Sequence, residues 1–315
     1  MMDGYDMELV EVCRRHRVFV ASDSPYQARA RLMQALWREA KGLECGLHRG
    51  TPLGSRLADE EAKDRLTNYL TDTIRRVVRE ELRKAEHSGK LFGKPRIYND
   101  LLSSQPLCFN LFAELQQDLD LATAAIQRMW PSAHRVTGIE FEHSPGRGDE
   151  RFTGDRSAFD VFVEYLSCDG KPGFIGVEVK YHEDLAGKAG ENKSRHDEVA
   201  SAMGVFRPGC LSKLKARPLQ QLWRDHLLAG SMLMAKERQH EEGGFVVLYP
   251  RANYHCERAV QAYRGCLAEE QQGFREWYLE DFALAVKAAG AGQWVDEFHE
   301  RYLAFGKLEK HGIGL

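Results

Sequence analysis

AFDVFVEY (residues 158–165) and FIGVEVKY (residues 174–181) are two apolar runs rich in aromatic and β-branched residues. This composition predicts two β-strands. Because side chains alternate along a strand, Glu178 and Lys180 project from one face, roughly 6.5 Å apart. Asp160 and Glu178 each stand among apolar neighbours, and a buried carboxylate is costly unless it meets a metal ion or another cation.

The segment Ser167–Pro172 between the two runs has the composition of a hairpin turn. In an antiparallel pair the numbers of facing residues have a constant sum. Pairing Asp160 with Glu178 centres the hairpin on Asp169, inside this turn, provided that the loop has an odd length or a bulge. The hairpin thus predicts two carboxylates and the Lys180 ammonium on one face.

Two carboxylates side by side suit a hard divalent cation such as Mg²⁺ or Mn²⁺, which takes oxygen ligands and keeps several waters. Such a cation polarises a phosphodiester and activates water, and a nearby lysine stabilises the charge that develops at phosphorus. The spacing also fits an exposed Asp and a Glu–Lys pair on the solvated face of an antiparallel sheet. The residues alone leave both interpretations open.

The rest of the chain predicts helices before and after these strands, and two further strands. Helical periodicity or capping predicts helices over residues 25–46, 57–86, 107–130, 218–239, 259–270 and 274–305, the last with a break near 290–292. Further strands are predicted at residues 136–142 and 244–249. The fold class is therefore α/β, with helices flanking a central sheet.

The pattern Asp160…Glu178-Val179-Lys180 on a strand–turn–strand unit resembles the PD-(D/E)xK nuclease superfamily, with Phe159 in place of the proline. Residues 103–112, 153–160, 175–181 and 221–224 are similar to a bacterial group of restriction-endonuclease-like proteins, and the likeness covers most of the chain from about residue 25. The resemblance implies a restriction-endonuclease-like core, a mixed central sheet flanked by helices, with an N-terminal helical extension. We assign residues 1–100 to that extension, packed on the core, and residues 101–315 to the core with its C-terminal helices.

Carried over by position, the resemblance implies that Asp160 and Glu178 bind the metal ion, with the Val179 carbonyl as a third ligand. Lys180 would be the catalytic lysine. Glu114 matches a carboxylate that members often add from the helix before the sheet, although it also fits an ordinary boundary position of that helix.

Four further residues are candidate substrate contacts. Gln221 matches a glutamine that some members place on the helix after the lysine strand, but a helical wheel puts it opposite the apolar face. Arg224 lies one turn beyond and could reach phosphate. Asp155 and Arg156 precede the active strand and could face the substrate, or could form a salt bridge within a loop.

The charge balance requires any nucleic-acid surface to be local. Lysine and arginine number 44 against 47 acidic residues, a net charge of −3, so the whole chain offers no field for polyanions. Two stretches are locally basic: residues 75–96, with eight basic and three acidic residues, and residues 188–217, with seven and three. Each fits a wall that contacts phosphate, and each equally fits a solvated surface.

Several classes of protein are excluded by missing patterns. The seven cysteines are scattered without a Cys-x-x-Cys pair, which predicts reduced thiols in the cytoplasm. His182, Glu183 and Asp184 alternate faces and cannot all converge on zinc. The sequence has neither a signal peptide, nor a membrane span, nor an ATP-binding Gly-rich loop.

The predicted function is Mg²⁺- or Mn²⁺-dependent hydrolysis of phosphodiester bonds, most readily in DNA. A role in defence against foreign DNA follows from the resemblance alone, as does a homodimer that cuts both strands. The alternatives are a nucleic-acid-binding or scaffold protein that keeps the fold without cleaving, and an interaction module in which the charged triad only decorates the surface.

Overall fold

The computed structural model describes residues 7–187, 190–268 and 273–314. The chain forms two compact units. Unit 1 comprises Met1–Ala113 and Ala291–Leu315, and unit 2 comprises Glu114–Gly290. The first break between the units along the chain lies after Ala113. The domain boundary predicted after residue 100 stays a prediction. Every predicted site residue lies in unit 2.

Unit 2 is built on a five-stranded mixed sheet. The strands lie in chain order across it, the first three antiparallel and the last two parallel to the third: β3 (Arg135–His143), β4 (Phe159–Leu166), β5 (Pro172–Val179), β6 (Glu242–Tyr249) and β7 (Phe274–Tyr278). Helices flank this sheet, so unit 2 is α/β as the sequence predicts.

The β4–β5 hairpin has the register that the sequence predicts. Its pairs run from Val161 opposite Val177 to Leu166 opposite Pro172, all with the constant sum required. Residues 167–171 form the odd-length loop, closed where the Lys171 N–H donates to the Ser167 hydroxyl over 3.1 Å. The prediction of this register is confirmed.

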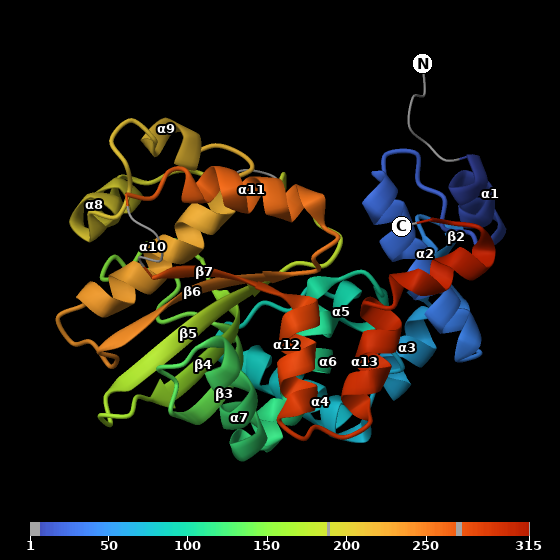
Figure 1. Cartoon of the computed structure of the whole chain (residues 1–315), viewed down its shortest axis with the longest axis horizontal. Coiled ribbons are helices and arrows are strands. Elements are labelled where there is room, and N and C mark those ends of the chain that lie inside the picture. The colour runs from blue at the N-terminus through green and yellow to red at the C-terminus, as the bar shows by residue number, and fades with distance from the viewer. Residues whose placement is uncertain (1–6, 188–189, 269–272, 315) are drawn as a thin grey trace. The chain divides into compact units, whose positions relative to one another are not determined.

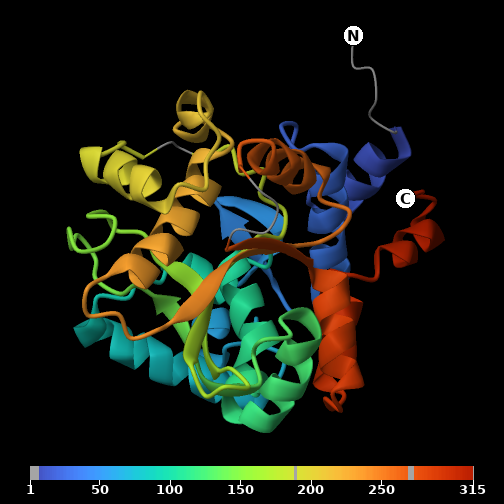
Figure 2. The same cartoon turned by 60° about the vertical axis from the view of Figure 1, so that its left-hand side comes forward.

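Helices cover the sheet of unit 2 on both faces (Figures 1 and 2). One group is α8 (Ser194–Met203), α9 (Leu211–Leu214), α10 (Gln220–Met234) and α11 (Tyr254–Arg264). Trp223 and Leu227 of α10 are buried with Phe174, Phe245 and Val247 of the sheet. The opposite group includes α7 (Leu119–Met129) and α12 (Leu279–Ala288), which pack on each other.

Unit 1 is mainly helical but also contains a β-hairpin. Its helices are α1 (Met7–Arg15), α2 (Pro25–Ala40), α3 (Asp59–Arg65), α4 (Asp72–Ser88), α5 (Arg96–Asn99), most of α6 (Ser104–Gln117), α13 (Trp294–Tyr302) and the 3-10 helix η1 (Phe305–His311). The hairpin joins β1 (Cys45–His48) to β2 (Thr51–Leu57). Arg49 and Gly50 both have positive φ at its two-residue turn, as a type I′ turn requires. The helices predicted over 25–46 and 57–86 leave only a short break here, so the two strands are not predicted from the sequence.

Four other elements differ from their predicted extents. Residues 274–278 form β7 rather than a helix start, because pairing with β6 overrides local helical periodicity. The predicted helix over 57–86 is interrupted at Leu66, which adopts φ +53°. The helix predicted over 107–130 begins earlier, as α6, and breaks at Asp118, whose side chain caps α7 by accepting the Leu121 N–H. The predicted helix over 259–270 starts earlier, as α11, and its last two residues lie outside the described part. None of the helices in the described ranges combines the length and apolar character of a bilayer span.

A buried arginine joins the two chain segments of unit 1. Arg301 has no exposed surface. Its guanidinium donates to the Gln34 side chain over 2.9 Å and to the Asn68 carbonyl and amide oxygens over 2.7 and 2.6 Å. It also lies 3.9 Å above the Trp37 ring. Neutral acceptors and an aromatic face thus hold a charge that would otherwise be costly to bury.

We predict that Arg301→Ala lowers the free energy of unfolding of the protein by about 3 kcal/mol or more, because it leaves buried acceptors unpaired. Urea denaturation measures this. Arg15→Ala is the control, since Arg15 is an exposed residue of α1 and should change stability by less than about 0.5 kcal/mol. Equal effects of the two variants would contradict the proposed role of Arg301.

Candidate active site

The carboxylate of Glu178 is the centre of a buried polar cluster in unit 2. Glu178 and Lys180 are 5% and 8% exposed. The Lys180 ammonium and the Gln221 amide both donate to the same oxygen, Glu178 Oε1, each over 2.5 Å. Neither donor therefore occupies Glu178 Oε2, which remains available as a ligand atom.

Asp160 lies beside Glu178 on the neighbouring strand. One step beyond the pair Val161–Val177, the register sets Asp160 opposite Glu178. Asp160 Oδ2 accepts the Val179 N–H over 2.9 Å. Burial and the negative charge of Glu178 raise the pKa of Asp160 well above its ordinary value, against the influence of Lys180. Two carboxylates in this position repel each other, and a cation between them would relieve that repulsion.

Lys180 stays charged at this site. Burial alone would lower the pKa of its ammonium, yet Glu178, Glu183 and Asp160 together raise it above the ordinary value. A lysine in this state donates hydrogen bonds and stabilises negative charge, but it cannot take a proton at neutral pH.

The chain just beyond Lys180 is fixed by an internal cap. Asn253 is fully buried, and its amide donates to the carbonyls of Tyr181 and Glu183, each over 3.0 Å. The Glu183 carboxylate accepts the Tyr181 N–H over 2.7 Å. Although burial acts to raise the pKa of Glu183, His182 and Lys180 lower it below its ordinary value. These bonds hold the end of β5 and Lys180 in place.

The donor set fits a hard divalent cation. Asp160 and Glu178 supply carboxylate oxygens on adjacent strands, and the chain supplies a positive lysine beside them. Within the described ranges, no three His, Cys, Asp or Glu side chains converge as a metal cage. Mg²⁺ commonly binds through one or two carboxylates and keeps several waters, so two carboxylates are a sufficient anchor.

A family model described as the PD-(D/E)XK nuclease superfamily matches residues 21–304. The chain belongs to the PD-(D/E)XK nuclease superfamily. The match covers nearly the whole chain and includes parts of both compact units. A search of curated proteins found no match, and neither did a search of solved structures. Membership indicates a nuclease fold and divalent-metal chemistry.

The Gln221 side chain contacts Glu178, although the helical wheel places it opposite the apolar face of α10, and a role in substrate binding stays a prediction. Its amide reaches Glu178, whereas Gln220 is buried and bonds to the Gly190 backbone and the Asn192 side chain. The wheel failed because α10 is buried around most of its circumference. The side opposite its apolar stripe meets the charged end of the sheet rather than solvent.

Asp155 has a structural environment rather than an open one. Its carboxylate accepts the Ser157 N–H and hydroxyl, the Thr153 hydroxyl and the His196 ring, all within 3.0 Å. Burial opposes ionisation, but these hydrogen bonds lower the pKa of Asp155 well below its ordinary value. Because the fully buried His196 accepts the Lys193 N–H at Nδ1, Nε2 is left to donate to Asp155. Asp155 is thus held within its loop by hydrogen bonds, and contact of Asp155 with substrate stays a prediction.

The remaining candidates are less closely tied to Glu178. Arg224 donates to the Glu191 carbonyl, and Arg156 is exposed, its carbonyl accepting from Arg147. Glu114 is half-buried on α6. Val179 contributes its N–H to Asp160. A ligand role for Glu114 or the Val179 carbonyl therefore stays a prediction.

The basic stretch over 188–217 is used largely for internal bonds. Lys193 donates to the Gly154 carbonyl, Arg195 to the Phe152 carbonyl, Arg207 to the Leu267 carbonyl, and Lys215 pairs with Asp197. Lys188 lies outside the described residues. These cations tie loops together, which favours the structural interpretation over a free phosphate-binding wall.

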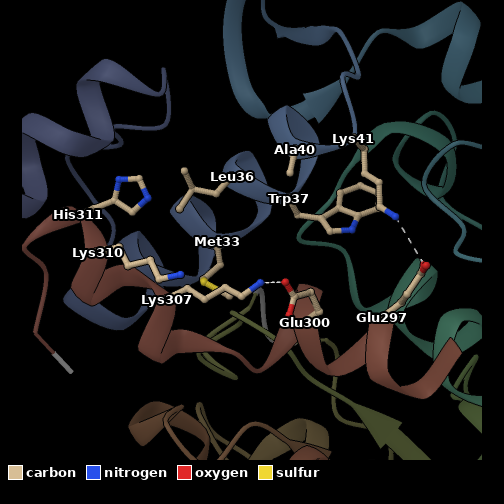
Figure 3. A pocket seen from close by; sticks show the side chains of 10 residues that line it. All are labelled: Met33, Leu36, Trp37, Ala40, Lys41, Glu297, Glu300, Lys307, Lys310 and His311. Carbon is tan, nitrogen blue, oxygen red and sulfur yellow. Dashed lines mark ion pairs between the residues drawn. The ribbon is translucent and has the colours of Figure 1, made fainter. Parts of the chain in front are cut away.

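A hollow of about 540 Å³ in unit 1 has none of the predicted site residues (Figure 3). Its apolar side chains on α2 face the lysines of η1. Lys41 pairs with Glu297 over 3.7 Å, and Lys307 pairs with Glu300. These are separate lysine–glutamate pairs, unlike the candidate site of unit 2, where Lys180 and Gln221 donate to the same oxygen of Glu178.

Asp225, one turn after Gln221 on α10, is a site residue that the sequence patterns did not indicate. Asp225 is 4% exposed, and its Oδ2 has no hydrogen-bond partner among the residues that the structure describes. Burial and the charges of Glu178 and Asp160 raise the pKa of Asp225 well above its ordinary value, against Lys180. The spacing Gln221-x-x-x-Asp225 indicates that Asp225 lies on the same side of the helix as Gln221, because residues four apart share a helix face.

We predict that Asp225 destabilises the metal-free protein as pH rises. The folded state keeps a proton that the unfolded state releases near pH 4, so stability is lost as pH rises from there towards the folded pKa, by about 1.4 kcal/mol per unit of pKa difference. Asp225→Asn should remove this loss, so the variant should gain stability relative to the native protein between pH 4 and 7.

Urea denaturation in a chelator at several pH values measures the effect. Asp169→Asn in the exposed hairpin turn is the control and should follow the native curve. Parallel curves for Asp225→Asn and the native protein would show that Asp225 ionises normally.

Proposed function

We propose that the chain is a metal-dependent nuclease that hydrolyses phosphodiester bonds in DNA, with Mg²⁺ or Mn²⁺ held by Asp160, Glu178 and the Val179 carbonyl. The observation that carries this proposal is the convergence on Glu178 Oε1 of a charged lysine and a glutamine amide, next to a second carboxylate. A bound divalent cation supplies Lewis-acid polarisation of the phosphate and activation of water.

The protein groups have separate tasks. Because Lys180 remains protonated among three carboxylates, it stabilises charge on the phosphate oxygens and does not act as a general base. Gln221 uses one N–H on Glu178, which leaves its carbonyl and second N–H to orient a water molecule or the substrate. Buried surroundings strengthen both interactions.

Several finer features belong to the same proposal. All seven cysteines are free thiols, which suits a reducing compartment such as the cytoplasm. DNA as the substrate, a homodimer and a role in defence rest on the resemblance to restriction-endonuclease-like proteins. Both Mg²⁺ and Mn²⁺ are proposed because the donor set contains only oxygen atoms, which suit both ions.

A second candidate is a nucleic-acid-binding or scaffold protein that keeps the fold without cleaving. The observation that favours it is the lack, among the described residues, of three side chains converging on one metal ion. The two candidates differ in one measurable property, since only a nuclease breaks the strand.

We predict that the protein cleaves DNA with Mg²⁺ or Mn²⁺ and is inactive in a chelator. Asp160→Asn and Glu178→Gln should each lower the cleavage rate by about two to three orders of magnitude, the loss typical for one electrostatic group. Gel assays on circular, linear and single-stranded DNA and on RNA measure the rate and identify the substrate.

Glu164→Gln is the matched control, because Glu164 is on the same strand as Asp160 but is partly exposed and pairs with His240. It should keep native activity. Cleavage that survives both site substitutions would refute the assignment. Binding of nucleic acid without cleavage in any divalent metal ion would favour the second candidate.

A further inference from the structure

An ion pair lies beside Asp160 on the side away from Glu178. The pairs Phe141–Val161 and His143–Phe159 enclose Glu142 and set it opposite Asp160 in the β3–β4 ladder. Glu142 Oε1 accepts the Arg147 guanidinium over 2.7 Å. After burial and Glu178, the charge of Glu142 is a further influence that raises the pKa of Asp160, as expected if the two carboxylates are close.

The guanidinium of Arg147 is held by two hydrogen bonds, which do not use all of its N–H donors. One guanidinium nitrogen binds Glu142, and the other donates to the Arg156 carbonyl over 2.7 Å. The side chains of Arg147 and Glu142 are each 14% exposed. A guanidinium has five N–H donors, so these two bonds leave others for a ligand. Its planar fork matches two oxygens of a phosphate group.

The backbone at Glu142 supports a functional role for the pair. Glu142 adopts φ +51° within β3, a conformation that costs a residue with a side chain free energy and often marks a functional site. Arg151, in the same connection between β3 and β4, differs. Its side chain is 71% exposed and pairs with Asp149, two residues away.

We propose that Arg147 binds a phosphate group of the nucleic acid next to the metal site, and that Glu142 positions its guanidinium. This inference rests on the proposed function. In the row Glu142, Asp160 and Glu178, Lys180 provides a positive charge at one end and Arg147 at the other. A phosphodiester between them would meet a cation on each side of the metal ligands.

The test is the salt dependence of binding to a fluorescent 20-base-pair DNA, with Glu178→Gln as the background so that the probe stays intact. Arg147→Ala should weaken binding about tenfold near 0.1 M salt and reduce the slope of log affinity against log salt by about one, as expected for one lost phosphate contact. Arg151→Ala is the matched control and should leave the slope unchanged.

Two conservative variants separate binding from folding. Arg147→Lys keeps the charge but loses the fork, so the slope should stay native while affinity falls severalfold. Glu142→Gln keeps an acceptor for Arg147 and should retain more affinity than Glu142→Ala. Circular dichroism checks that each variant is folded, and Arg147→Lys decides the question if Arg147→Ala unfolds.

The outcomes distinguish the inference from the proposed function. Native affinity in both Arg147 variants, together with metal-dependent cleavage that Glu178→Gln abolishes, would overturn the phosphate contact and leave the nuclease intact. No cleavage and no DNA binding by the native protein would overturn the proposed function itself.

Discussion

Repulsion between two carboxylates on neighbouring strands is the constraint on which the candidate site depends. The hairpin register places Asp160 opposite Glu178, and burial strengthens the repulsion between them. Hydrogen bonds from Lys180 and Gln221 to one oxygen of Glu178 offset part of this repulsion. A cation at the remaining carboxylate oxygens of Asp160 and Glu178 would offset the rest. The arrangement therefore suits a divalent metal ion better than a purely structural ion pair.

The surrounding structure keeps this repulsive group in position. Asn253 fixes the backbone after Lys180 through two carbonyls, and Asp155 with His196 closes the loop before β4. Such buried, fully bonded polar groups give rigid geometry. They hold the ends of β4 and β5, which limits how far the charged groups can move apart.

The shared superfamily and the individual details of this chain carry different information. Membership, shown over residues 21–304, accounts for the mixed sheet flanked by helices. Asp225 under the site and the Glu142–Arg147 pair beside it come from the geometry of this chain. Function is decided by such groups rather than by the fold alone.

The sequence by itself determined the hairpin and the three charged residues on it. Strand alternation and a constant pairing sum are local rules, so the turn around Asp169 was enough to place Asp160 opposite Glu178. Only the tertiary structure decided which distant segments complete the site. The contact of Gln221 with Glu178 depends on how α10 packs on the sheet, and the helical wheel opposed it because a wheel assumes that one side faces solvent. The residues of β7 have helical periodicity, but they form a strand because pairing with β6, which is remote in sequence, outweighs local periodicity.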